Sequence, residues 1–213
     1  MNIKIIEELQ KKSKKRKFIQ TYELIVNLKK EYDLNKSENR ITEYLEIPNP
    51  LGKKLKVCAI VGPELEKMAS NIFDEVITKD KMKELNKREA KKLVRRNYHF
   101  VAQISVMPDV GRYLGKYLSV KDKMPNPKFG LTFPDNADEK FLTNLYNKLQ
   151  KTVRVVIKRH ITFGIPIGTE NLENEKVLEN AKFVLDWLNN KIGKENIRSV
   201  YLKLTMSEAV KIL

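Results

Sequence analysis

Few side chains in this chain of 213 residues could carry acid–base or metal chemistry, because it contains only two histidines and one cysteine. His99 and His160 fall in different predicted domains, and neither has a second metal ligand at a useful spacing. The paired acids Asp138 and Glu139 are typical of a solvated helix start. We therefore predict that the protein is not an enzyme and that it has no catalytic residue, metal or other cofactor.

The turn at residues 61–64 comes nearest to a phosphate-binding loop, since it follows a predicted strand and opens a predicted helix. It lacks the further glycines of a dinucleotide fingerprint and the lysine of a Walker loop. Cys58 lies in the apolar run just before this turn, where a buried small hydrophobe is expected rather than a nucleophile. Neither feature favours catalysis.

Positive charge is the strongest chemical feature of the chain. Lysine and arginine total 42 against 27 acidic residues, which gives a formal net charge of +15. Such a surplus attracts polyphosphates such as RNA, acidic proteins or anionic membranes. No apolar run approaches the roughly 20 residues of a membrane-spanning helix, and the N-terminus lacks the pattern of a secretory signal. We expect a cytoplasmic protein without membrane association.

Residues 11–17 concentrate this charge, with six basic side chains in seven positions. The run is either a phosphate-binding arm or a soluble linker between the first helix and a strand that begins at Phe18. Charge alone does not decide between these two roles.

The elements that position these residues differ along the chain, and residues 55–151 alternate between short strands and helices. Strands are expected at 56–61, 75–78 and 98–105, and helices at 64–71, 79–96 and 137–150. In the last helix, Phe141 and Leu145 share the apolar face. Strands separated by helices predict parallel crossover units. We therefore expect a three-layer, Rossmann-like α/β domain.

The two flanks follow the alternation of half-buried antiparallel strands. Strands are expected at 21–28, 41–47, 153–157, 161–167 and 196–205. A helix is predicted at 172–192, with Asn171 and Gly193 as its caps and with Phe183 and Trp187 in the core. Neither flank has enough sheet alone, whereas pooling five strands and two helices makes one layer.

Residues 1–54 and 152–213 are therefore predicted to form one discontinuous α+β domain, an antiparallel sheet with helices, into which the α/β domain of residues 55–151 is inserted. The chain crosses between the domains near 48–54 and 150–152. The first crossing is rich in prolines and other turn-forming residues, and we expect it to be part of a hinge.

Residues 107–127 carry the most specific motif. Gly111, Leu114 and Leu118 follow helical spacing, while the second Met-Pro pair, at Met124, forces an extended segment. Four basic residues are threaded through the motif, namely Arg112, Lys116, Lys121 and Lys123. The motif resembles the signature region of the L-one family of large-subunit ribosomal proteins, in its archaeal and eukaryotic-like branch. Segments 17–28 and 199–206 carry the same resemblance.

The resemblance implies a set of RNA contacts, all on the discontinuous domain. They are Lys17, Phe18, Thr21, Arg40, Pro166, Gly168, Ser199, Thr205, Met206 and Ser207. The family normally has glycine at the position of Ser207. Hydroxyl groups suit this role because they can both donate to and accept from an RNA 2′-hydroxyl. On the residues alone, Thr21 and Thr205 could instead be ordinary strand formers and Phe18 part of the core.

The resemblance further implies a structural constituent of the large ribosomal subunit, located in the cytoplasm. Such a protein binds large-subunit rRNA, forms the mobile stalk near the tRNA exit site, and has exit-site tRNA and other ribosomal components as partners. Translational repression through its own mRNA is a further expectation, and we expect a monomer when the protein is free.

Two other classes of function stay open on the residues alone. One is an RNA-processing or nucleotide-utilising α/β enzyme whose active site is assembled in the inserted domain by folding. The other is an adaptor that binds acidic proteins through its lysine-rich face. RNA binding should weaken steeply with salt, whereas an adaptor complex should survive nuclease.

Overall fold

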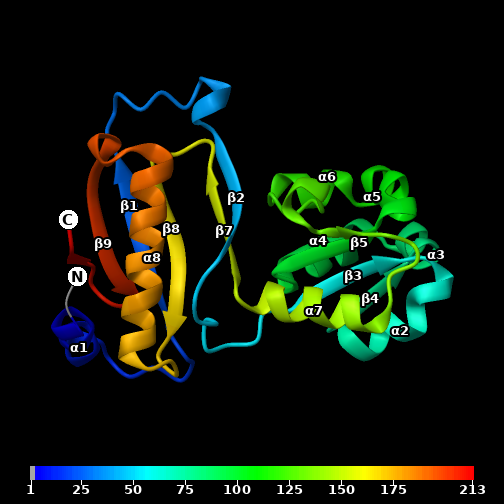
Figure 1. Cartoon of the computed structure of the whole chain (residues 1–213), viewed down its shortest axis with the longest axis horizontal. Helices are drawn as coiled ribbons and strands as arrows, with labels where there is room; N and C mark the ends of the chain where they lie inside the picture. Colours follow the sequence, from blue (N-terminus) through cyan, green and yellow to red (C-terminus); the bar gives the residue numbers. More distant parts are fainter. Residues whose placement is uncertain (1–2) are drawn as a thin grey trace. The chain divides into compact units, whose positions relative to one another are not determined.

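The computed structural model describes residues 3–213, which fold into two compact units. The first unit comprises the N-terminal segment up to Lys54 together with Lys151–Leu213, and the second comprises Leu55–Gln150. Figure 1 shows the two groups of elements, with both ends of the chain in the first. The second unit is thus inserted between the two halves of the first.

The main sheet of the first unit is antiparallel and draws on both halves of the chain. Its strands are β1 (Thr21–Leu28), β8 (Thr162–Thr169), β9 (Ile197–Leu204) and β10 (Val210–Lys211), in the order β10-β9-β1-β8. Strand β1 lies in the middle and pairs with β8 on one side and β9 on the other. The N-terminal strand therefore takes both of its partners from the C-terminal part of the chain.

A second sheet in this unit has two strands, β2 (Ile41–Glu46) and β7 (Thr152–Ile157), which pair antiparallel along their whole lengths. The expected pooling of five strands into one layer is therefore wrong in detail. The five predicted strands exist, but they are divided between two sheets, and the short strand β10 was not predicted.

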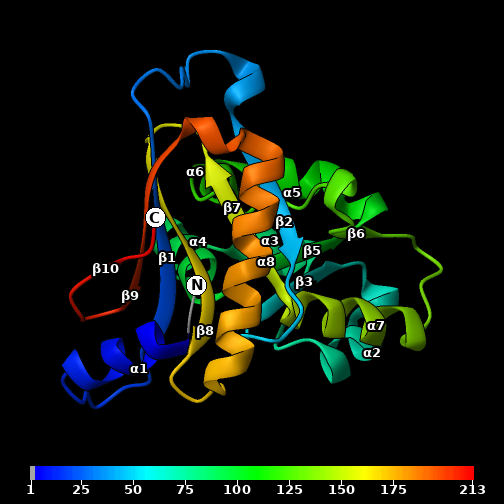
Figure 2. The ribbon, with the colours of Figure 1, turned by 60° about the vertical axis from the view of Figure 1, so that its left-hand side comes forward.

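Helix α8 (Asn174–Ile192) lies along one face of the main sheet, and α1 (Ile3–Lys12) packs against it (Figures 1 and 2). The sheet turns its apolar residues towards α8, as the fully buried Leu24 and Val26 of β1 show. Gly193 ends the helix with a φ of 89°, a conformation that favours glycine, as predicted.

Two expectations for α8 are wrong. The residue that precedes the helix is Glu173 rather than Asn171. Phe183 is 38% exposed, so it lies at the surface rather than in the core. The apolar spacing of Val177, Ala181 and Val184 also predicts a buried stripe, and all three residues are buried as expected.

The inserted unit is built on a parallel sheet with helices on both faces. Its strands are β3 (Val57–Val61), β4 (Glu75–Thr78), β5 (His99–Gln103) and β6 (Thr132–Phe133), in the order β4-β3-β5-β6. On one side lie α2 (Glu66–Ile72) and α7 (Glu139–Gln150); on the other lie α3 (Lys79–Glu84), α4 (Lys87–Arg96), α5 (Met107–Tyr113) and α6 (Gly115–Val120) (Figure 1). This is the expected three-layer α/β arrangement.

Strand β3 is buried along its whole length, including Cys58, as the apolar sequence of this segment predicts. Short 3-10 turns complete the described chain at Ser37–Asn39, Pro63–Leu65, Ile104–Val106, Pro127–Phe129 and Lys194–Asn196. Phe141 of α7 is 44% exposed, so its expected place on the buried face is wrong, whereas Leu142 and Leu145 are buried.

The expected single helix over residues 79–96 is two helices, because Asn86 starts a new one. The Asn86 side chain accepts hydrogen bonds from the backbone amides of Arg88 (2.9 Å) and Glu89 (3.0 Å). The Glu89 carboxylate in turn accepts from the Asn86 amide at 3.1 Å. This capping box satisfies amides that would otherwise lack partners at the start of α4.

The motif at residues 107–127 is helical up to Val120 and non-helical around the second Met-Pro pair, as predicted, but its helical part is divided into two short helices, which was not predicted. Val110, Leu114 and Leu118 of this segment are buried in the core of the inserted unit, together with residues of β3 and β5. Lys123 turns inwards, and its ammonium donates to the Val94 carbonyl (2.8 Å) and to the Asn97 carbonyl at the end of α4. One basic residue of the motif therefore stabilises a helix terminus.

The predicted crossing at residues 48–54 is held on the first unit. The Asn49 amide donates to Asn180 Oδ1 of α8 at 2.9 Å, and Asn180 Nδ2 returns a bond to the Asn49 carbonyl at 3.0 Å. Leu51 is fully buried. Gly52 has a φ of +77°, and a Cβ there would lie 2.6 Å from Thr169 Oγ1, so the turn requires glycine. Most of this segment is thus part of the first unit.

Candidate nucleic-acid interface

The start of β1 and the end of β9 meet at one end of the main sheet, although they are far apart in sequence. The Thr21 amide donates to Thr205 Oγ1 at 3.0 Å, and Tyr22 pairs with Leu204 in the adjacent register position. Thr205 is exposed, whereas Thr21 is 8% exposed. The structure therefore brings the two predicted contact segments together and leaves the Thr205 side chain at the surface.

Three large apolar side chains stand exposed at this end of the sheet. Phe18 is 52% exposed, Ile19 is 53% exposed and Met206 is 56% exposed. Apolar residues at such positions are informative when they occur together, because single exposed ones are common. Phe18 is therefore not a core residue, and Ile19 joins it although the sequence reasoning did not single it out.

Gln20 holds this end together from inside. It is fully buried, and its side chain accepts from the Met206 amide (3.1 Å) and donates to Ser13 Oγ (3.1 Å) and Glu170 Oε1 (3.1 Å). The backbone amide of Gln20 also donates to Glu170 Oε2 at 2.9 Å. The buried side-chain amide of Gln20 thus fixes three segments relative to one another: the basic run at residues 11–17, the turn after β8 and the turn after β9. Sequence reasoning missed Gln20 and Glu170.

The basic run is followed by irregular chain rather than by a strand at Phe18, since β1 begins only at Thr21. The strand expected at 21–28 is confirmed, whereas a strand start at Phe18, directly after the basic run, is wrong. A pocket of about 540 Å³ opens beside this segment. It is lined by Gln10, Ser13, Lys15, Arg16, Lys17, Phe18, Ile19 and Glu170. The basic side chains and the exposed aromatic ring therefore border the same hollow.

Lys53 is a further residue that the sequence did not indicate. Its ammonium donates to Thr21 Oγ1 at 2.9 Å, so the Thr21 hydroxyl is already engaged within the protein. Burial lowers the pKa of Lys53 from its ordinary value, and the nearby Glu23 carboxylate opposes that shift. Lys53 thus links the segment after β2 to the start of β1.

Ser199 lies at the other end of the sheet from Thr205. Asn27, the partner of Ser199, lies six positions along β1 from Thr21, which corresponds to about 20 Å. Asn27 Nδ2 donates to Ser199 Oγ at 3.0 Å, and Thr162 Oγ1 donates to Asn27 Oδ1 at 2.8 Å. This polar row crosses three strands and borders a pocket of about 370 Å³. The predicted contacts therefore form two clusters rather than one.

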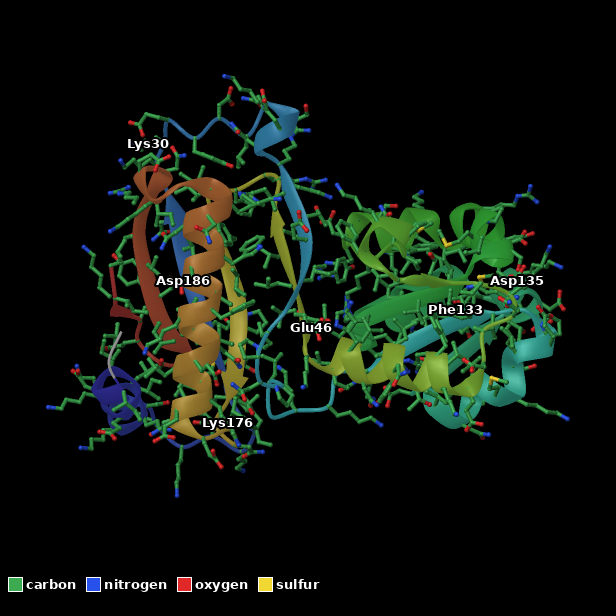
Figure 3. All side chains as sticks on the ribbon, in the orientation of Figure 1. Lys30, Glu46, Phe133, Asp135, Lys176 and Asp186 are labelled. Carbon is green, nitrogen blue, oxygen red and sulfur yellow. The ribbon has the colours of Figure 1, made fainter. Side chains whose placement is uncertain are left out.

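Arg40 is also remote from the Thr21–Thr205 contact. It is exposed at the end of the loop that follows β1, and its Nε donates to the Leu34 carbonyl at 2.8 Å. Figure 3 shows this loop through Lys30 at one end of the unit and the start of α8 through Lys176 at the other. Arg40 therefore lies at the end of the first unit that carries the loop after β1.

Pro166 and Gly168 both lie in β8, with different surroundings. Pro166 pairs with Glu23 beside a register shift in the β1–β8 ladder, and β8 is an edge strand of the main sheet, where proline is tolerated. Gly168 is buried, and a Cβ there would lie 3.0 Å from Val177 Cγ2 and 3.1 Å from Leu172 Cδ2. Close packing against α8 accounts for the glycine.

Ser207 forms the turn after β9. Its hydroxyl accepts from the Leu204 amide at 2.8 Å and donates to the Glu208 carbonyl at 2.8 Å. The residue has no positive φ, so the turn does not need glycine. The hydroxyl satisfies the backbone where the chain departs from the usual family pattern.

Comparison with known proteins shows which family the chain belongs to. Residues 9–208 match the ribosomal protein L1p/L10e family. The chain belongs to this family. It is 50% identical to the large ribosomal subunit protein uL1 of Nanoarchaeum equitans over 206 residues, which cover 95% of each chain. The uL1 protein of Thermococcus kodakarensis is 37% identical over 214 residues, covering 99% of this chain and 95% of that protein.

Family membership confirms the resemblance drawn from the motif, and with it the prediction of a non-enzymatic ribosomal protein. His99 is buried at the start of β5, and His160 lies in the turn between β7 and β8 of the other unit. Among residues 3–213, no group of three or more His, Cys, Asp or Glu side chains could hold a metal ion. In the same part of the chain no helix is long and apolar enough to cross a membrane.

Proposed function

We propose that this protein is a constituent of the large ribosomal subunit and that its first unit binds large-subunit rRNA through the end of the main sheet where Thr21 meets Thr205. The observation that carries the proposal is the convergence there of a basic segment, exposed apolar side chains and an exposed hydroxyl. Its relatives are large-subunit ribosomal proteins with which it aligns over nearly its whole length.

The chemistry of this surface suits folded RNA. RNA helices hide most base edges in a deep groove, so proteins recognise their shape and 2′-hydroxyls. The exposed Thr205 hydroxyl accepts from the Thr21 amide (3.0 Å) and donates to the Thr21 carbonyl (3.4 Å), which leaves one lone pair to accept from a 2′-hydroxyl. Phe18 and Met206 supply apolar surface against riboses or unstacked bases, and Lys17 adds attraction to phosphates.

The finer roles follow from the family and are proposals of the same kind. The rRNA complex forms the mobile stalk near the tRNA exit site, where exit-site tRNA and other ribosomal components are its partners. The same surface binds a similar element in its own mRNA and represses translation. The inserted unit adds positioning and moves about the crossings at Lys54–Leu55 and Gln150–Lys151, because residues 48–53 are held on the first unit.

Binding of the full chain to a large-subunit rRNA fragment tests the main proposal. Phe18→Ala is compared with Phe141→Ala, since the two rings are 52% and 44% exposed and only the first lies at the proposed surface. Loss of one stacking or apolar contact corresponds to about 1–3 kcal/mol, so Phe18→Ala should weaken binding at least fivefold. Equal effects of the two substitutions would refute the proposal.

A further inference from the structure

The outward face of α4 in the inserted unit carries a row of basic side chains. Arg88, Lys91, Lys92 and Arg95 are all exposed and repeat at the i, i+3, i+4, i+7 spacing of one helix face. The opposite face of the same helix holds the buried Ala90, Leu93 and Val94. We call these four exposed residues the α4 stripe.

The α4 stripe weakens the helix that carries it. Like charges three or four positions apart repel, and the stripe contains two such pairs at i, i+4, namely Arg88 with Lys92 and Lys91 with Arg95. Within residues 3–213 none of the four forms an ion pair with a carboxylate. Arg96, by contrast, pairs with Glu75. Glu84 and Glu89 line a hollow together with Lys92 but are not paired with it, so the fold offsets the repulsion only in part, which favours an external partner.

Residues on and just after helix α6 extend this positive surface. The helices on the opposite face of the sheet carry less positive charge. Helix α6 packs beside α4 on the same side of the sheet and adds the exposed Lys116, with Lys121 just beyond its end (Figure 1). Helix α4 has six basic residues and one acidic residue, whereas α2 and α7 together have three basic and two acidic residues. The charge of the inserted unit is therefore concentrated on one face.

We propose that the α4 stripe is a second, sequence-independent binding site for the phosphate backbone of structured RNA. A rigid row of point charges fits a row of phosphates, and such contacts position a protein on RNA without reading bases. Val120 is the only large apolar side chain exposed on the described helices α4 and α6, and this scarcity favours a phosphate backbone over the mixed surface of an acidic protein. The inference extends the proposed function, because both sites take RNA, but it depends on different residues in the other unit.

The test uses the full chain, a 20-base-pair RNA duplex of arbitrary sequence, and two double variants matched in chemistry. Lys91→Gln with Lys92→Gln removes half of the stripe, and Lys67→Gln with Lys140→Gln removes two exposed lysines from α2 and α7. The first pair should lower the slope of log affinity against log salt by about 1–2 and weaken binding roughly tenfold at low salt. The control pair should change affinity less than twofold.

A second readout assigns the contact to residues. Acetylation of the free and duplex-bound wild-type protein should show Lys91 and Lys92 protected by RNA and Lys67 and Lys140 unprotected. The stripe variant should also unfold at the same or a slightly higher temperature than wild type, because it loses like-charge pairs. Lower binding together with unimpaired stability excludes simple misfolding.

Three outcomes would overturn the inference. The first is an equal loss of affinity in the two double variants, which would indicate an effect of bulk charge only. The second is that the duplex does not protect Lys91 and Lys92 from acetylation. The third is that polyglutamate protects these lysines and RNA does not, which would indicate an acidic protein partner. Phe18→Ala separates this site from the proposed function. It should weaken binding of the rRNA fragment while Lys91 and Lys92 stay protected by the duplex, so either site can fail without the other.

Discussion

Gln20→Met tests whether the buried side-chain amide positions the proposed RNA-binding end of the sheet. The substitution keeps the length of the side chain and removes its hydrogen bonds to the Met206 amide, Ser13 Oγ and Glu170 Oε1. The two hydrogen bonds that the Gln20 backbone makes to Glu170 are retained: its amide donates to Glu170 Oε2, and its carbonyl accepts from the Glu170 amide. The change therefore acts on the connection between three segments more than on the sheet itself.

The expected loss of stability follows from those three bonds. Met206 and Glu170 are exposed, so water can replace part of what the amide supplied. At about 0.5–1 kcal/mol for each bond, the free energy of unfolding should fall by about 1.5–3 kcal/mol. Binding should suffer in addition, because Lys17, Phe18 and Met206 must then be ordered on contact with RNA. Ordering three side chains costs at least about 1.5 kcal/mol, or roughly tenfold in affinity.

Asn180→Leu is the matched control. Asn180 is also a fully buried amide of the first unit with three side-chain hydrogen bonds, two to Asn49 and one to the Ile167 carbonyl. Both variants are measured by urea denaturation and by fluorescence anisotropy with the rRNA fragment, at a temperature where each is fully folded. We expect similar losses of stability but a roughly tenfold loss of affinity only for Gln20→Met. Equal affinities for the two variants would refute the positioning role.

Three further predictions concern other parts of the chain. Met206→Asp should weaken RNA binding at least tenfold by placing a carboxylate at an exposed contact, with the thermal unfolding midpoint within about 2 °C of wild type; a matching fall in the midpoint would show that Met206 is structural. Asn86→Ala should lower the free energy of unfolding by about 0.5–2 kcal/mol in urea, because α4 loses its capping box. Burial raises the pKa of Cys58 above its ordinary value of 9.0, so the thiol stays protonated in the folded chain while it ionises in the unfolded one. Stability should therefore fall as the pH rises from 8 to 10, and this fall should be smaller in Cys58→Ala.

The fold was predictable where one residue pattern had one structural meaning. The alternation of Tyr22, Leu24 and Val26 predicted β1, and the apolar run around Cys58 predicted a buried parallel strand. The break before α4 was also readable, because Asn86 followed three positions later by Glu89 is a capping signature that the long charged stretch obscured. The division of the flanking strands into two sheets was not readable, since strand periodicity does not encode which strands pair.

The RNA contacts inferred from the resemblance stay a prediction, and their arrangement could not be inferred from the sequence. The family resemblance pointed to Phe18, Thr205 and Ser199, yet only the register of β9 against β1 shows that Ser199 lies about 20 Å along the strand from Thr205. Gln20 carried no signal, because a glutamine before a strand is ordinarily at the surface. Its burial depends on Glu170 and Met206, which reach it only through tertiary structure.

Because β1 lies between β8 and β9, the first unit can finish folding only after both of these strands have been synthesised. A nascent chain that has reached Gln150 holds every strand of the parallel sheet, so the inserted unit can close while later residues are still being added. Strand β1, made early, has to wait unpaired for partners such as Thr162, which is 135 residues beyond Asn27. Thr205 arrives 184 residues after Thr21. The proposed RNA-binding end of the sheet can therefore assemble only after Thr205 has been synthesised.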